Sequence, residues 1–195
     1  TRELFSVSSQ HYAFVVNAFV SLLKRADMTR YELFLRETRT YEIIEDVKNF
    51  RSEIGVLFLN SYNRDVLTKM FDDNRLTYTS LFKARPHIFV SKSNPLAKHE
   101  VVSLEDLEDF PYLSYDQGIH NSFYYSEEIL SQIPHKKSIV VSDRATLFNL
   151  LIGLDGYTIA TGILNSNLNG DNIVSIPLDI DDEIDIVYLK HEKAT

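Results

Sequence analysis

The sequence contains no cysteine, and this absence removes several kinds of chemistry at once. Without cysteine the chain has no disulfide, no thiolate nucleophile and no cysteine-ligated zinc, so packing has to stabilise the fold. We expect a cytoplasmic protein, although the missing cysteine is only compatible with that compartment. Long apolar runs are missing as well. No segment approaches the roughly 20 apolar residues of a membrane span, and the opening TRELFSVSS lacks the apolar region of a signal peptide.

Basic residues are fewer than acidic ones. Lys and Arg number 20 against 28 Asp and Glu, which gives a formal charge of −8 and a pI near 5.2. A chain of this charge is not expected to grip a phosphate backbone by itself. Its composition, 44% hydrophobic and 12% aromatic, is typical of a globular protein that buries a sizeable core.

Motifs for catalysis and metal binding are also missing. The six histidines are scattered, and no P-loop, G-x-S-x-G or G-x-G-x-x-G sequence occurs. The acidic segment DIDDEID, residues 179–185, lacks the glycine and the closing glutamate of a calcium loop. We therefore predict no metal, no cofactor and no enzymatic activity.

Strand and helix patterns alternate in two blocks. The first block has predicted strands at 3–9, 29–37, 53–60 and 76–82, with helices at 12–25, 39–52 and 66–73. The second has predicted strands at 86–92, 111–116, 138–143 and 157–162, with helices at 103–110, 122–133 and 145–154. Extended runs at 172–180 and 183–191 follow, and we expect the last strand to return to the first block. This order predicts two open α/β units with linkers near 81–86 and 162–172.

Polar residues stand where several predicted strands end. Ser8 and Ser9 precede a helix, so their hydroxyls and the free amides of its first turn suit an anion, although a serine there also serves as an ordinary cap. His11 on that turn can sense ligand charge, with a plain surface histidine as the alternative. Thr38, Tyr115, Gln117, Thr161 and Gly162 end other strands, and Arg36 and Arg39 are possible anion partners. Open α/β sheets bind ligands at such carboxyl ends.

Three stretches resemble LysR-type transcriptional regulators. The most specific is KSNPLAKHEVVSLEDLEDFPYLSYDQG, residues 92–118, where a strand leads to a PLA sequence, a short acidic helix and another strand. SEIGVLFL at 52–59 and RATLFNLLIGLDGYTIATGIL at 144–164 are similar to two further family segments. The last of these departs from the family at Thr161-Gly162, where a proline is usual.

The resemblance implies the effector-binding (regulatory) domain of such a regulator without its winged helix-turn-helix domain, and the opening at Thr1 agrees with a piece of a longer chain. The implied fold class is α/β, with two Rossmann-like lobes joined by two crossovers, similar to type 2 periplasmic binding proteins. Residues 1–83 plus 165–195 would form lobe I and residues 84–164 lobe II, with hinge residues Leu81 and Phe82. An effector bearing a carboxylate, sulfate or phosphate would bind between the lobes. The implied effector-binding residues are Ser8, Ser9, His11, Thr38, Tyr115, Gln117, Thr161 and Gly162.

The resemblance also implies partners. It predicts a homodimer that becomes a tetramer in the full-length protein, contact with DNA only through the absent N-terminal domain, and no membrane association. Candidates for the dimer surface, with core packing as an equal alternative, are Tyr12, Val15, Val16, Phe19 and Leu23.

Two other interpretations stay open. A solute-binding protein that feeds a transporter shares the two-lobed architecture, and only the segment 92–118 favours the regulator over it. An enzyme is the third reading, but no nucleophile, base or metal set supports it.

Overall fold

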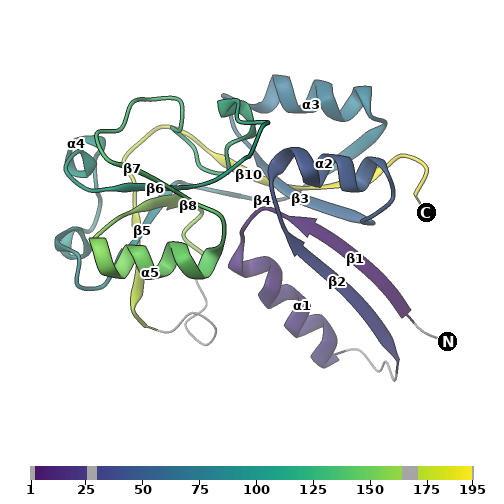
Figure 1. The fold of residues 1–195 in the computed structure, drawn as a ribbon, viewed down its shortest axis with the longest axis horizontal. Coiled ribbons are helices and arrows are strands. Elements are labelled where there is room, and N and C mark those ends of the chain that lie inside the picture. The colour runs from purple at the N-terminus through teal and green to yellow at the C-terminus, as the bar shows by residue number, and fades with distance from the viewer. Residues whose placement is uncertain (1–2, 26–29, 164–170, 195) are drawn as a thin grey trace.

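The computed structural model describes residues 3–25, 30–163 and 171–194, which form two α/β lobes side by side (Figure 1). Lobe I contains β1 (Glu3–Ser9), α1 (Ala13–Arg25), β2 (Tyr31–Glu37), α2 (Thr40–Lys48), β3 (Ile54–Leu59), α3 (Arg64–Asp73), β4 (Leu76–Ala84) and β10 (Ile184–His191). Lobe II contains β5 (His87–Ser91), η1 (Pro95–Lys98), α4 (Leu104–Leu107), β6 (Tyr112–Tyr115), η2 (Phe123–Tyr125), β7 (Ser138–Val141), α5 (Arg144–Leu154), β8 (Thr158–Ala160) and β9 (Ile173–Pro177).

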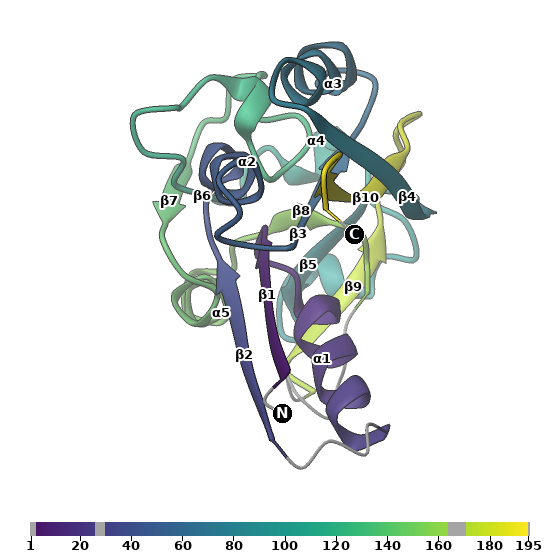
Figure 2. The same ribbon diagram turned by 90° about the vertical axis from the view of Figure 1, so that its right-hand side faces the viewer.

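The lobe I sheet has the strand order β2-β1-β3-β10-β4. Its first three strands are parallel, whereas β10 runs antiparallel to both β3 and β4. Helices α2 and α3 cover one face and α1 lies on the other (Figures 1 and 2). The final strand therefore returns to lobe I, as the sequence predicts.

Strand β3 is apolar on both sides because both of its faces are covered. Leu57 and Leu59 pack under α2 and α3, whereas Val56 and Phe58 point into the core shared by the two lobes. The nearly unbroken apolar run of residues 53–60 thus reflects a central strand with no solvated face. That arrangement puts the carboxyl ends of β1 and β3 directly against lobe II.

Lobe II is built from two small sheets joined edge to edge. Strand β5 pairs antiparallel with β8 on one side and β9 on the other, and β6 pairs parallel with β7. A parallel bridge between Tyr112 and Tyr157 connects the two sheets beside β8. Helix α5 packs over them, burying Leu147 and Leu151 against Phe89 and Leu113.

The chain crosses between the lobes after β4 and again between β9 and β10. Strand β9 pairs with β5 and so lies in lobe II, although the predicted lobe I range of 165–195 includes it. Its apolar residues Ile173 and Ile176 need the lobe II core for burial. The predicted hinge residues Leu81 and Phe82 lie in β4, where the pairing with β10 is irregular: Ser80 pairs with Val187 and Phe82 with Ile186, which leaves Leu81 unpaired in a bulge.

The predicted helix at 122–133 is wrong. Only Phe123–Tyr125 forms a short 3-10 turn, and the chain then runs irregularly to β7. Glu127, Glu128 and Ile129 are buried one after another, a pattern that no amphipathic helix produces. The residues instead turn inward between the lobes. Among the described residues, no helix is long and apolar enough to cross a membrane.

We expect Gly55→Ala to destabilise lobe I. A Cβ at Gly55 would lie 2.7 Å from Ile43 Cγ2 and 2.9 Å from Val47 Cγ2, under the buried face of α2. Overpacking of this kind costs about 1–3 kcal/mol of unfolding free energy, measurable by urea denaturation. Gly153→Ala is the matched control, because a Cβ there meets nothing within 4 Å and alanine is the better helix former by about 0.5–1 kcal/mol. Equal stabilities of the two variants would contradict the tight packing of α2 on β3.

Candidate functional site

A pocket opens between the lobes at the carboxyl ends of β1 and β6. It is open to solvent on one side, and about 60 Å³ of its interior is accessible to water-sized molecules. Its wall is mostly apolar, with Phe14 and Phe58 from lobe I and Phe89, Leu147, Phe148 and Ile163 from lobe II. The polar residues that line it are His11, Tyr12, Tyr115, Glu127, Glu128, Arg144, Thr158 and Thr161. A concave apolar wall with few polar groups is typical of a small-molecule site.

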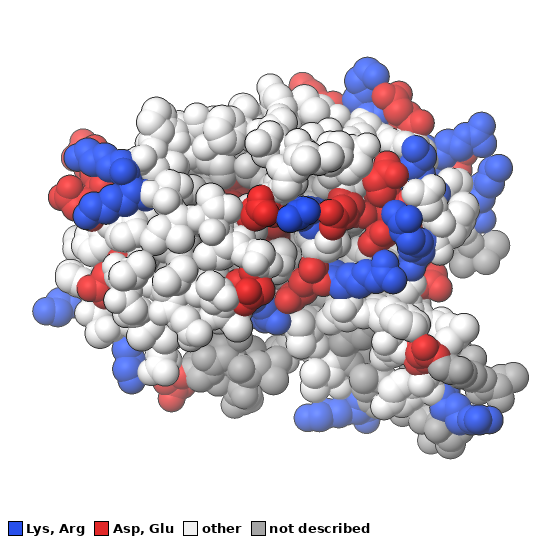
Figure 3. Space-filling model, viewed as in Figure 1, with Lys and Arg blue, Asp and Glu red and all other residues white. Residues whose placement is uncertain are grey.

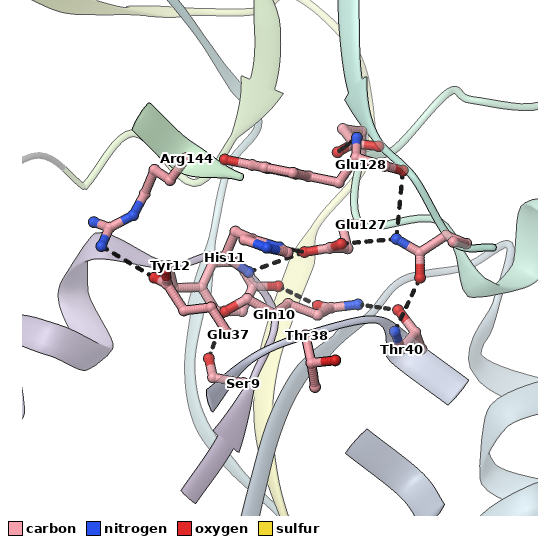
Figure 4. A network of polar contacts seen from close by, with 12 residues as sticks. Ser9, Gln10, His11, Tyr12, Glu37, Thr38, Thr40, Glu127, Glu128 and Arg144 are labelled. Carbon is pink, nitrogen blue, oxygen red and sulfur yellow. Dashed lines mark hydrogen bonds and ion pairs between the residues drawn. The ribbon is translucent and has the colours of Figure 1, made fainter. Parts of the chain in front are cut away.

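The Glu127 carboxylate bridges the two lobes at one end of this pocket (Figure 4). Its Oε1 accepts hydrogen bonds from the backbone N–H of His11 at 2.9 Å and lies 2.7 Å from the His11 ring Nδ1. Its Oε2 accepts from Gln117 Nε2 at 2.7 Å. The Glu127 side chain is only 3% exposed, so these donors replace the water that a carboxylate requires.

Gln117 extends this bridge to the start of α2. While its Nε2 donates to Glu127, its Oε1 accepts from the backbone N–H of Thr40 at 2.9 Å. Two backbone donors of lobe I, at His11 and at the N-terminus of α2, are therefore both occupied by side chains of lobe II. The His11 amide follows the serines where the sequence predicts anion binding, and here a side chain of the protein itself occupies it.

Ser8 and Ser9 do not line the pocket. The Ser8 hydroxyl donates to Asp46 Oδ2 at 2.7 Å and lies 2.7 Å from Ser52 Oγ, on the α2 side of the sheet. The Ser9 hydroxyl donates to the carbonyl oxygen of Gln10 at 2.6 Å. Successive residues of a strand face opposite sides, so adjacent serines cannot both point at one ligand.

The other predicted site residues divide into two groups. His11 and Tyr115 line the pocket and stack ring on ring, with centroids 4.0 Å apart. Thr161 lines it from the end of β8, and Gly162 follows with φ +86°, in the conformation that favours glycine. Thr38 lies at the edge, where its hydroxyl bonds to Glu42 Oε2 at 2.5 Å, so the structure does not bring it to the pocket.

Four residues of the site were missed by sequence analysis: Gln10, Glu127, Glu128 and Arg144. Gln10 is buried, donating to Thr40 Oγ1 at 2.7 Å and accepting from Phe58 N–H at 3.1 Å. The two glutamates were missed because residues 122–133 were predicted to form a helix, and adjacent acids on a surface helix normally face solvent. Arg144 had a local signal, because it directly follows Asp143, which caps α5 by accepting from Thr146 N–H.

Ion pairs flank the pocket on both sides. Arg144 at the start of α5 reaches Glu37 at the end of β2, with Nη2 3.1 Å from Oε1. Arg39 pairs with Asp116 at 3.0 Å, so both arginines link lobe I to lobe II. Acidic and basic side chains accordingly gather beside each other where the lobes meet (Figure 3). The predicted anion partners Arg36 and Arg39 are both paired with carboxylates and do not line the pocket.

Glu128 is the second buried acid of the pocket. It is 4% exposed, and its Oε2 accepts from the Tyr115 backbone N–H at 3.1 Å. Burial raises the pKa of Glu128 well above its usual range, the neighbouring Glu127 charge raises it further, and the Tyr115 N–H opposes both. Burial and the same two acids raise the pKa of the Tyr12 hydroxyl. The site is therefore short of positive charge.

The described residues contain no group of three or more His, Asp or Glu side chains arranged to hold a metal ion. Of the residues predicted for the dimer surface, Val15 is buried in the shared core, and the hydroxyl of Tyr12 bonds to Gln10 Oε1 at 2.5 Å. Val16 is half-buried on α1, and the side chains of Phe19 and Leu23 lie outside the described part of the chain.

The chain passes twice between two α/β lobes, and a pocket lies between them. This architecture defines a domain of the type 2 periplasmic-binding-protein-like fold. Residues 10–194 match the LysR substrate binding domain, and the chain belongs to that family. No curated protein sequence matches it.

Solved structures show the same fold. The effector binding domain of QuiR in complex with shikimate is 16% identical, with a TM-score of 0.65 over 100% of this chain and 90% of that one. The BenM effector binding domain with its effector benzoate is 17% identical, with a TM-score of 0.64 over 99% and 86%. A LysR-family regulator from Pseudomonas aeruginosa, the PA01 protein, is 13% identical, with a TM-score of 0.63 over 100% and 66%. The chain thus spans about two thirds of the length of that regulator.

Glu127→Gln is expected to lower the unfolding free energy by about 1–3 kcal/mol, because an amide group would replace one of the two oxygens that receive these donors. Chemical denaturation measures the change. Glu108→Gln on the exposed surface removes the same charge and should stay within about 0.5 kcal/mol of the parent. A Glu127 variant as stable as that control would show that the bridge does not hold the lobes together.

Glu128→Gln is expected to change how stability depends on pH. A folded-state pKa above the unfolded value means that the folded protein holds a proton that the unfolded chain releases, so stability falls as pH rises above about 4.3. Glutamine removes this loss. The Tm of the variant minus that of the parent should therefore grow between pH 5 and pH 8 in thermal melts. A difference that is independent of pH would contradict the raised pKa.

Proposed function

We propose that the chain is the effector-binding domain of a LysR-type transcriptional regulator and senses a small metabolite in the interlobe pocket. The observation that carries the proposal is that pocket, walled by apolar side chains from both lobes, in a chain that belongs to the LysR substrate-binding domain family. Family members are not enzymes, which agrees with the lack of catalytic motifs. QuiR and BenM, which share the fold, have structures with shikimate and benzoate, small molecules that carry a carboxylate.

We further propose that the effector carries an anionic group and that Arg144 receives it. Nη2 of Arg144 pairs with Glu37, but its Nε is buried without a hydrogen-bond partner among the described residues. A guanidinium N–H forms strong charge-assisted hydrogen bonds to anions, so Nε can donate to the effector while Nη2 stays with Glu37. Since Ser8 and Ser9 are engaged inside lobe I, Arg144 replaces them as the anion-binding group.

The signal would arise from closure of the lobes around the effector. A ligand shifts a conformational equilibrium by its differential affinity for the two states. Leu81 and Phe82, beside the first crossover, remain our proposed hinge, and the bulge at Leu81 is a position where the strand can bend. In the whole protein we propose a homodimer or tetramer in the cytoplasm that passes this movement to an N-terminal DNA-binding domain. Family membership favours this function over a transporter's solute-binding protein.

A thermal-shift panel of carboxylates, phosphates, sulfates and neutral metabolites tests the proposal. We expect saturable shifts from acids with an apolar body. Arg144→Gln should weaken binding of any such hit by about 1.5–3 kcal/mol, the value of a hydrogen bond to a charged group. Arg39→Gln is the matched control, because Arg39 also forms an interlobe ion pair but does not line the pocket. Equal losses in both variants would indicate that the ion pairs only hold the lobes together.

A further inference from the structure

After all internal hydrogen bonds are assigned, one buried oxygen faces the pocket without a partner. It is Oε1 of Glu128, a residue that is 4% exposed and lines the pocket, and it accepts no hydrogen bond from any described residue. Such an atom costs about 1–3 kcal/mol, so native proteins seldom leave one unexplained. Both oxygens of the adjacent Glu127 are satisfied, which shows that the chain can supply donors here.

The surroundings of Glu128 favour a cation over a neutral donor. Glu127 lies next to it on the same segment, and Glu37 on β2 pairs with Arg144, which lines the pocket. Among the described residues, Arg144 on α5 is the only permanent cation that lines the pocket. The remaining titratable groups that face Glu128 are Tyr12 and His11 after β1, and Tyr112 and Tyr115 on β6.

We propose that the effector carries a protonated amine that binds Glu128, in addition to the anionic group that binds Arg144. This inference rests on the proposed function and names the ligand class: an amino acid or a closely related amphoteric molecule with an apolar side chain. The apolar part would lie against Phe14, Phe89 and Phe148. Glu128 Oε1 and Arg144 Nε, the two pocket-lining atoms among the buried side-chain atoms without a hydrogen-bond partner in the described part of the chain, would each gain one.

Binding of an amine in this position is coupled to loss of a proton. In the free protein burial and the Glu127 charge raise the pKa of Glu128, so its carboxyl keeps its proton to a higher pH than an exposed glutamate does. An ammonium group pairs with the carboxylate form, so the proton leaves as the ligand binds. Affinity should therefore rise with pH, by up to about tenfold per unit, until Glu128 is ionised in the free protein. A ligand that instead accepts a hydrogen bond from neutral Glu128 would bind more weakly as pH rises.

The experiment compares matched sets of compounds by isothermal titration calorimetry. One set is L-phenylalanine, 3-phenylpropionate and 2-phenylethylamine, and another is L-leucine, 4-methylpentanoate and 3-methylbutylamine. We expect the amino acid of at least one set to bind about tenfold or more tightly than its deaminated acid. Titrations in two buffers of different ionisation enthalpy should show release of a proton, and binding should strengthen as the pH is raised through the titration of Glu128.

Variants separate the role of Glu128 from the rest of the site. Glu128→Gln should remove the preference for the amine, the proton release and the pH dependence together, whereas the charge-matched Glu108→Gln should leave all three intact. An acid that binds as tightly as its amino acid overturns the inference and leaves the proposed function standing. Amine binding that Glu128→Gln does not change overturns it too. Failure of every compound, here and in the thermal-shift panel, overturns both proposals.

Discussion

The arrangement of the two lobes depends on one buried carboxylate. Glu127 lies between them with almost no access to water, and a carboxylate there is stable only if protein donors replace its hydration. His11 supplies a backbone and a ring donor from lobe I, and Gln117 supplies an amide from lobe II. Because Gln117 also accepts from the first residue of α2, the same contacts fix where that helix begins relative to lobe II.

This bridge decides what is left for a ligand. The amides at the end of β1 and the start of α2 would suit an anion, but the protein's own side chains occupy them. The groups left to bind an effector are therefore Arg144 at the start of α5 and Glu128, each of which has one buried atom without a hydrogen-bond partner among the described residues. A guanidinium and a carboxyl group at that end, together with a wall of phenylalanine side chains, are the features from which the effector class is inferred.

The sequence was a good guide to the regular elements and a poorer one to the segment between β6 and β7. Strand β3 and helix α2 were predictable because their apolar residues follow the periods of a strand and a helix. Residues 122–133 have a helix-like composition, but tertiary contacts override it. Tyr124 stacks on Tyr62 and Tyr125 lies edge-on to Tyr41, both across the lobe boundary, while Glu127 and Glu128 turn inward. Ser8 and Ser9 were mispredicted for a related reason. The sequence placed them at the end of a strand, but it did not show which face of the sheet each side chain takes.

The sequence by itself determined the two alternating α/β blocks, the return of the last strand and the positions of His11, Tyr115 and Thr161 at strand ends, because these follow from periodicities local to the chain. Only the tertiary structure decided that β9 belongs to lobe II and that Glu127, Glu128 and Arg144 meet between the lobes. His11 and Glu127 are 116 positions apart, and no local pattern records that pairing. Their contact exists because a buried carboxylate must find donors wherever the fold places them.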